Sequence, residues 1–192
     1  MAKDDDDGAM ITWPMERLSR LMRSREHEDG LNPAQWEALR YLARANRFSN
    51  SPGALTRYLG ATKGTISQTL KALERKGFIS KAQRESERRS ITLTLTEKGN
   101  TALASDPWAE LSLAADELGG KTRRRLAKGL GELLTGELTK GGHQSFGLCV
   151  SCKFFREKGR DHDARGPHQC MFFDEPLSSA EARNICVEHV TG

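Results

Sequence analysis

The apolar period of the chain changes from helical to alternating at Gly77, and this change constrains the fold more than any other feature. Before it, residues 51–77 place Leu and Ile three or four positions apart in two short stretches, as amphipathic helices do. Ser51 and Thr62 stand where helix caps are expected, and each stretch ends at a glycine. After Gly77, residues 90–96 alternate Ile and Leu with Thr, the pattern of a half-buried strand. Two helices joined by a tight turn and followed by a hairpin predict a winged helix-turn-helix.

Longer amphipathic segments flank this centre. Residues 11–26 and 121–139 carry Leu, Ile and Met at helical spacing, and Asn32 can cap a further helix. We therefore expect a mainly α fold with a small β-wing (α+β). Three parts are predicted: a disordered or tag-derived tail at 1–10, a winged-helix domain at 11–140, and an extension at 143–192.

Basic side chains gather in the middle of the chain. Residues 51–90 carry nine Lys and Arg against three Glu, as a polyanion-binding surface requires, although a solvated face would look the same. On the second short helix, Gln68 can pair with an adenine edge, while basic side chains can hold phosphates. The predicted DNA contacts are Thr62, Lys63, Thr65, Ser67, Gln68, Lys71 and Arg75 on this helix, and Arg84, Arg88 and Arg89 on the hairpin.

Over about residues 11–140 the sequence resembles the MarR family of bacterial transcription regulators. The resemblance is densest between Thr62 and Gly99, and one position departs from it, since Glu87 stands where family hairpins commonly carry Asp. It implies a homodimer, interleaved through its first and last helices, that reads a pseudo-palindromic double-stranded DNA operator. The positions that carry the resemblance are Leu73, Glu74, Gly77, Ile79, Glu87, Arg88, Arg89, Leu95, Thr96 and Gly99. The alternative for the flanking leucine stripes is an intramolecular core.

All four cysteines lie in the last quarter of the chain, as Cys149-x2-Cys152-x17-Cys170-x15-Cys186. A segment of about fifty residues with few large apolar side chains rarely builds a core of its own without a staple. Two thiolates spaced by two residues can converge on one ion, and the four together suit tetrahedral zinc or a four-cysteine iron–sulfur cluster. The spacing therefore predicts a metal-binding extension.

An iron–sulfur cluster is our preferred cofactor, because a regulator gains a switch from a centre that responds to iron, oxygen or redox state. We hypothesise that its loading acts on DNA binding through the dimer helices. With a purely structural zinc, the regulator would instead sense a small-molecule effector. A metal-free thiol switch is a third possibility. His168 and His189 are candidates to replace a cysteine as ligand or to donate a hydrogen bond.

The sequence gives less support to other classes of function. We see no base–nucleophile pair, no phosphate-binding glycine loop and no HExxH motif, so we expect a non-enzyme; a metal- or thiol-dependent redox protein or enzyme is the remaining alternative. No apolar run approaches the roughly 20 residues of a membrane helix, so no membrane partner is expected. We expect a cytoplasmic protein, where cysteines favour metal or redox chemistry over disulfides.

Overall fold

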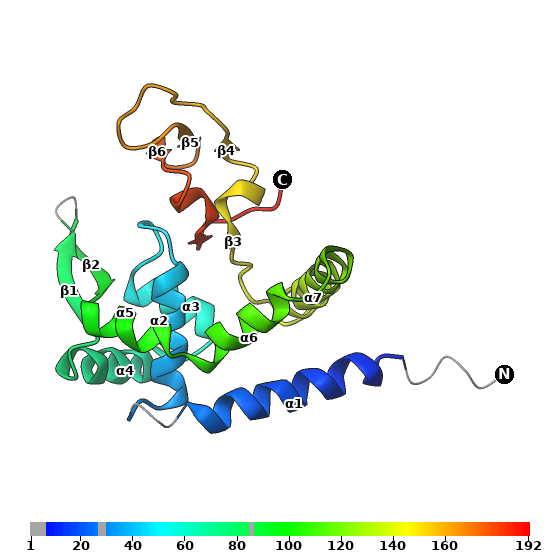
Figure 1. The fold of residues 1–192 in the computed structure, drawn as a ribbon. Helices are drawn as coiled ribbons and strands as arrows, with labels where there is room; N and C mark the ends of the chain where they lie inside the picture. Colours follow the sequence, from blue (N-terminus) through cyan, green and yellow to red (C-terminus); the bar gives the residue numbers. More distant parts are fainter. Residues whose placement is uncertain (1–6, 27–29, 85–86) are drawn as a thin grey trace.

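A computed structural model describes residues 7–26, 30–84 and 87–192, which fold into a helical body with a two-stranded wing and a separate cap of short strands (Figure 1). The helices of the body are α1 (Ala9–Arg25), α2 (Pro33–Arg44), α3 (Pro52–Leu59), α4 (Lys63–Arg75), α5 (Glu97–Ala104), α6 (Pro107–Asp116) and α7 (Gly120–Lys140). The wing is β1 (Ile79–Arg84) and β2 (Glu87–Leu95). The mainly α fold with a small β-wing is thus confirmed.

The helix starts lie where the sequence places them. The side chain of Asn32 accepts a hydrogen bond from the Gln35 amide at 2.9 Å, and Gln35 returns one to the Asn32 amide, which forms a capping box. Ser51 and Thr62 cap α3 and α4, each with a side chain that accepts a hydrogen bond from the amide three residues on. Gly60 ends α3 in the left-handed region, at φ +61°, which glycine adopts without strain.

The wing is longer than the sequence pattern indicates. Residues 81–89 read as a charged hairpin tip, but antiparallel pairing continues from Ile79↔Leu95 to Gln83↔Ile91, where the register shifts. Backbone hydrogen bonding, which any side chain permits, extends the strands into the charged segment. The alternation of apolar residues marks only the half of β2 that packs on the body.

One helix is not anticipated. Between the helix after Thr96 and the long last helix, α6 begins at Pro107, with Asp106 as its cap. Asp106 accepts a hydrogen bond from the Trp108 amide at 3.1 Å and a bidentate pair from Arg40, at 2.7 and 2.9 Å. The cap residue is therefore buried in an ion cluster, which fixes α6 to α2.

The core of the body lies between α2, α3, α4 and the wing. Its fully buried side chains come from the stripes that the sequence pattern identifies, with one contribution from β2. They include Trp36, Leu39, Leu55, Leu70, Leu73 and Leu93. This packing holds α4 with one face inward and leaves its other face to solvent.

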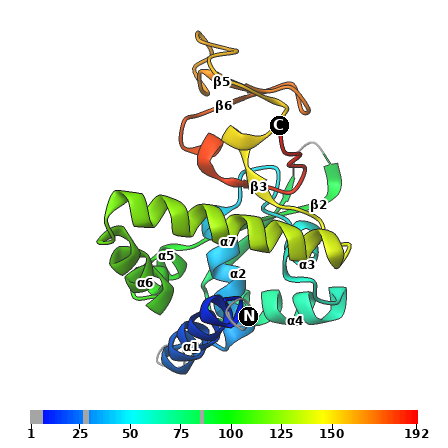
Figure 2. The same cartoon turned by 90° about the vertical axis from the view of Figure 1, so that its right-hand side faces the viewer.

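The helices α1 and α7 contribute almost nothing to this core. Met22 is the one residue buried in α1, and α7 has none. Both helices reach away from the wing, and Figure 2 shows α7 lying across the body between the cap and α1. The alternative in which their leucines form an intramolecular core is therefore wrong for the described residues. Among those residues, no helix is both long and apolar enough to cross a bilayer.

The segment after Gly142 forms the cap, which we call the tail (residues 143–192). Its elements are β3 (Gly147–Leu148), η1 (Cys149–Ser151), β4 (Phe155–Arg156), β5 (His168–Cys170), β6 (Glu175–Leu177), η2 (Glu181–Arg183) and β7 (Ile185–Cys186). β3 pairs with β7, and β4, β5 and β6 form a small antiparallel sheet. The tail sits over the connection between α2 and α3 (Figures 1 and 2), and two of its residues, Ile185 and Val187, belong to the core of the body.

Candidate nucleic-acid interface and cysteine pocket

The outward face of α4 is a continuous polar and basic surface. Ile66, Leu70 and Leu73 turn inward, and the predicted DNA contacts of this helix all lie on the exposed side. These exposed residues are Thr62, Lys63, Thr65, Ser67, Gln68, Lys71 and Arg75. The structure therefore brings the predicted residues of this helix together on one face.

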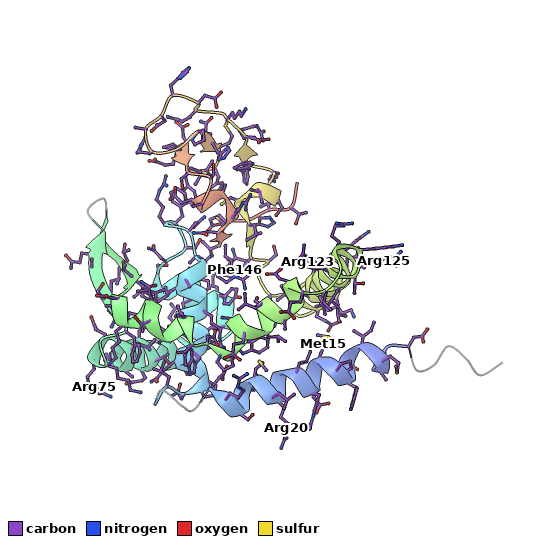
Figure 3. All side chains as sticks on the ribbon, viewed as in Figure 1. Met15, Arg20, Arg75, Arg123, Arg125 and Phe146 are labelled. Carbon is purple, nitrogen blue, oxygen red and sulfur yellow. The ribbon has the colours of Figure 1, made fainter. Side chains whose placement is uncertain are left out.

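Two cations of this face carry no internal partner. Within the described part of the chain, Lys71 and Arg75 make no ion pair, whereas the nearby Lys81 binds Glu74 at 2.7 Å. Figure 3 shows Arg75 directed away from the body at the end of α4. Unpaired basic side chains on an exposed helix face are available to phosphates, because binding there breaks no internal salt bridge.

The wing carries the other predicted DNA contacts. Arg84 ends β1, and Arg88 and Arg89 lie in β2, close in sequence to the turn of the hairpin. Their side chains, and the turn at residues 85–86, lie outside what the structure describes. Their predicted DNA contacts stay predictions.

All four cysteines of the tail line a single pocket. They come from four separate places in the fold: η1, the turn that follows it, β5 and β7. The rest of the wall is mainly aromatic and aliphatic: Phe154, Phe155, Phe172, Phe173 and Leu177, with Glu188. Each cysteine is a free thiol, and all except Cys152 are buried. The predicted set of sulfur ligands therefore shares one apolar cavity.

Two of the sulfurs interact directly. Cys149 donates a hydrogen bond to Cys186, which raises the pKa of Cys149 and lowers the pKa of Cys186. A further hydrogen bond from the Asn46 side chain favours the Cys186 thiolate. The Cys149 and Cys186 sulfurs therefore lie within hydrogen-bond reach of each other.

The side chains of the pocket are not arranged as a complete metal site. In the described residues, no three or more His, Cys, Asp or Glu side chains are placed to hold a metal ion. His168 lies outside the pocket wall, where its Nδ1 accepts from the Lys158 amide at 3.2 Å. His189 is buried outside the wall as well; its Nε2 is 3.0 Å from Ser151 Oγ and its Nδ1 has no hydrogen-bond partner. The structure thus gathers the cysteines and leaves both histidines apart from them.

Several residues at the pocket carry no sequence signal of a site. Asn46 donates from Nδ2 to the Cys149 sulfur at 3.4 Å, across 103 positions of the chain. Phe48 stacks on Phe173 with ring centroids 4.2 Å apart. A lone Asn and a lone Phe in a loop are too common to indicate a function, so only the paired aromatics beside Cys152 and Cys170 could have suggested an apolar wall.

Known proteins resemble the winged-helix part of the chain. Residues 29–90 match the MarR family. The transcriptional repressor MprA of Escherichia coli K12 is 27% identical over 128 residues, which are 59% of this chain and 73% of that protein. A MarR transcriptional regulator of Methanosarcina mazei has a similar fold, at 22% identity and a TM-score of 0.54, over 68% of this chain and 98% of its own.

A structure of Staphylococcus aureus MepR in complex with DNA also has this fold. It is 15% identical, with a TM-score of 0.55, over 70% of this chain and 99% of its own. These solved structures are covered almost completely, while about a third of this chain lies outside the alignment. The fold they share is therefore that of a shorter protein.

Proposed function

The chain belongs to the MarR family of DNA-binding transcription regulators, and from this premise we propose that it reads a pseudo-palindromic operator as a homodimer. The exposed, unpaired basic face of α4 is the observation that carries the proposal. A helix of this kind fits the major groove, where Gln68 can pair with a base edge while Lys71 and Arg75 hold phosphates. The wing would extend the contact toward the minor groove.

The dimer rests on the apolar side chains that the body leaves uncovered. Trp13 of α1 is 70% exposed, and Leu134 of α7 is 60% exposed. Such side chains recur along both helices and on α6; they include Met10, Ile11, Leu18, Leu113, Leu126 and Leu133. Large apolar side chains in this number are rarely left to water, and a second copy of the same helices would bury them.

Salt dependence of DNA affinity tests the DNA-binding part. Selection from random DNA duplexes gives an operator, and fluorescence anisotropy then measures affinity at several salt concentrations. The variant Lys71→Ala should reduce the slope of log K against log salt by about two, one for each protomer of the dimer. Lys128→Ala, on the exposed face of α7, is the matched control and should leave the slope unchanged. An unchanged slope in Lys71→Ala would remove α4 from the interface.

For the tail, we propose that the four cysteines bind a metal centre, an iron–sulfur cluster, that modulates DNA binding. Four thiols on one apolar pocket support it, because additional thiolates there need a cation. Such an aromatic wall would also limit the access of water and oxygen to a cluster and so influence its redox potential. Loading requires the sulfurs to close around the centre, which the short strands and turns of the tail allow.

Anaerobic purification with metal analysis tests this centre. We expect iron and acid-labile sulfide in the protein, together with the visible absorption of a cluster, and loss of all three in Cys170→Ser. A colourless protein with one zinc per chain would show that the centre is a structural zinc and not a cluster. The regulator would then sense a small-molecule effector. Metal-free protein that forms a Cys149–Cys186 disulfide on oxidation would leave a thiol switch instead.

A further inference from the structure

The connection between α2 and α3 lies between the cysteine pocket and the winged helix. We call residues 45–50 the coupling loop. It rises from the body to the underside of the tail, as both ribbon views show (Figures 1 and 2). Ala45 even forms an isolated parallel bridge with Ile185, next to Cys186. The loop is therefore in contact with the tail along its length, and it is covalently part of the helix-turn-helix.

On the tail side, the loop is hydrogen bonded to both neighbours of Cys186 as well as to Cys149. The Asn46 amide donates to the Ile185 carbonyl at 2.9 Å, and the Val187 amide donates to Ser49 Oγ at 2.8 Å. The Asn46 side chain donates to the Cys149 sulfur. A change in the position of either sulfur is thus felt by Asn46 or Ser49.

Neither residue can exchange its partner for water. Asn46 is 1% exposed and Ser49 is fully buried. Asn46 Oδ1 accepts from Ser49 Oγ at 2.7 Å and from the Phe48 amide at 3.1 Å, so its two ends are committed to the loop and to the cysteine. A rotation of this amide breaks several buried hydrogen bonds at once, which makes the network respond as a unit.

On the other side, the loop is connected to the wing and to α3, the helix that precedes α4. The carbonyl of Asn50 accepts from the Leu93 amide of β2 at 2.8 Å. The next residue, Ser51, caps α3 through the Ala54 amide at 3.2 Å. The carbonyl of Ser49 accepts from the buried Tyr41 hydroxyl at 2.7 Å. A displacement of the loop therefore moves the start of α3 and the anchor of the wing together.

The remaining polar contacts between tail and body are weaker candidates for this role. Arg57 of α3 is 3.7 Å from Glu188 and 3.1 Å from Gln144, at the exposed edge of the interface. Exposed pairs contribute little and adjust freely, so they transmit little displacement. Arg47, by contrast, belongs to the coupling loop, and its part-buried hydrogen bonds to Glu181 and to the Pro176 carbonyl add to the contact through that loop. The hypothesised route through the dimer helices stays a hypothesis, and the hydrogen bonds between the cysteine region and the body centre on the coupling loop.

We infer that Asn46 is the positioning residue that couples the cysteine site to the DNA-reading surface. This inference rests on the proposed metal centre. A metal-bound thiolate accepts a hydrogen bond more strongly than a thiol does. Loading at Cys149 and Cys186 therefore tightens the Asn46 and Ser49 network and fixes the loop. Loss of the metal releases the loop, and with it the start of α3 and the wing anchor at Leu93.

The test compares DNA affinity in loaded and metal-free protein, at one salt concentration, for wild type and two variants. Asn46→Asp keeps the size and the Oδ1 acceptor but removes the Nδ2–H donor to Cys149. Arg57→Gln is the matched control, since it removes a polar tail contact that touches no cysteine. We expect the ratio of the two affinities to be at least about fivefold in wild type and Arg57→Gln, and near one in Asn46→Asp with full metal content.

The possible outcomes test the proposed metal-dependent modulation and the role of Asn46 separately. A wild-type ratio near one in fully loaded protein contradicts the proposed modulation itself. A large wild-type ratio that Asn46→Asp retains overturns the coupling role of Asn46 alone. If Asn46→Asp does not load, hydrogen exchange in wild type decides: loading should slow exchange of the Val187 and Leu93 amides severalfold, and unchanged exchange at Leu93 overturns the inference.

Discussion

The winged helix and the tail are stabilised in different ways. The body buries large aliphatic and aromatic side chains from four helices and a hairpin around one core. The buried cluster of the tail consists of Cys149, Cys170 and Cys186 with a single large aliphatic residue, Leu177. The other large aliphatic side chains that the tail buries, Ile185 and Val187, belong to the core of the body. The comparison teaches that the body is organised by apolar burial, whereas the tail depends on its sulfurs and on the surface beneath it.

This difference bears on regulation. A region with its own core changes little when a ligand leaves, because its packing is independent of the ligand. A region organised around four thiols changes when those thiols change partners, because it has few other interactions to hold it. The tail is therefore suited to sensing, and the body is suited to DNA binding.

The largest expected effect separates the two regions at the wing. Replacing Arg88 and Arg89 together by Ala removes four guanidinium groups from a dimer, and operator affinity at physiological salt should fall by at least about 100-fold. Metal content and dimer mass, measured by elemental analysis and light scattering, should not change. Undiminished DNA binding would mean that the body does not read DNA through its wing.

A second large effect should be confined to the tail. Cys170→Ser should abolish metal binding and raise hydrogen exchange across β4, β5 and β6, which pair around this cysteine. The body should keep its helical circular dichroism, since its core includes no cysteine. Met171→Ser, at an exposed neighbouring position, is the control. Exchange that stays slow in Cys170→Ser would show that the tail folds without its sulfurs.

A change at the dimer interface is a third way to separate DNA binding from metal binding. Leu134→Asp places a charge on the exposed apolar face of α7 and should leave the chain monomeric at micromolar concentration, by light scattering. Operator affinity should fall with it, because two half-sites are then no longer read together, while metal content stays the same. A dimer that persists in this variant would move the interface away from α7. Lys128→Ala, at an exposed charged position of the same helix, should stay dimeric.

The smallest effect tests the contact between the regions. Ile185→Ala removes a buried side chain that the tail inserts into the body and should lower the free energy of unfolding by about 2–4 kcal/mol. Val190→Ala, at an exposed position of the tail, should cost less than about 0.5 kcal/mol. Denaturant titration measures both. Equal effects would show that the tail does not share the core.

The same contrast between local and long-range interactions explains which features the sequence predicts. The caps at Asn32, Ser51 and Thr62 are predictable because capping acts within three residues, and the inward face of α4 is predictable because helical periodicity is local. The shared pocket of the cysteines follows from spacing together with the chemistry of thiols. Local patterns therefore identify both regions.

The contact between the regions has no such signal. Asn46 meets Cys149 across 103 positions, and nothing near either residue indicates the other. The length of the wing is missed for a related reason, since backbone pairing in the charged part of β1 and β2 needs no apolar pattern. Interactions that depend on tertiary placement are visible only in the structure.

Operator affinity of one preparation, measured anaerobically before and after removal of its metal, tests the central claim most directly. The account predicts a cysteine-bound metal in the starting material and a change in affinity of at least about fivefold when it is removed, reversed on reloading. A preparation that binds the operator with the same affinity in both states, or that never holds metal at its cysteines, would contradict it.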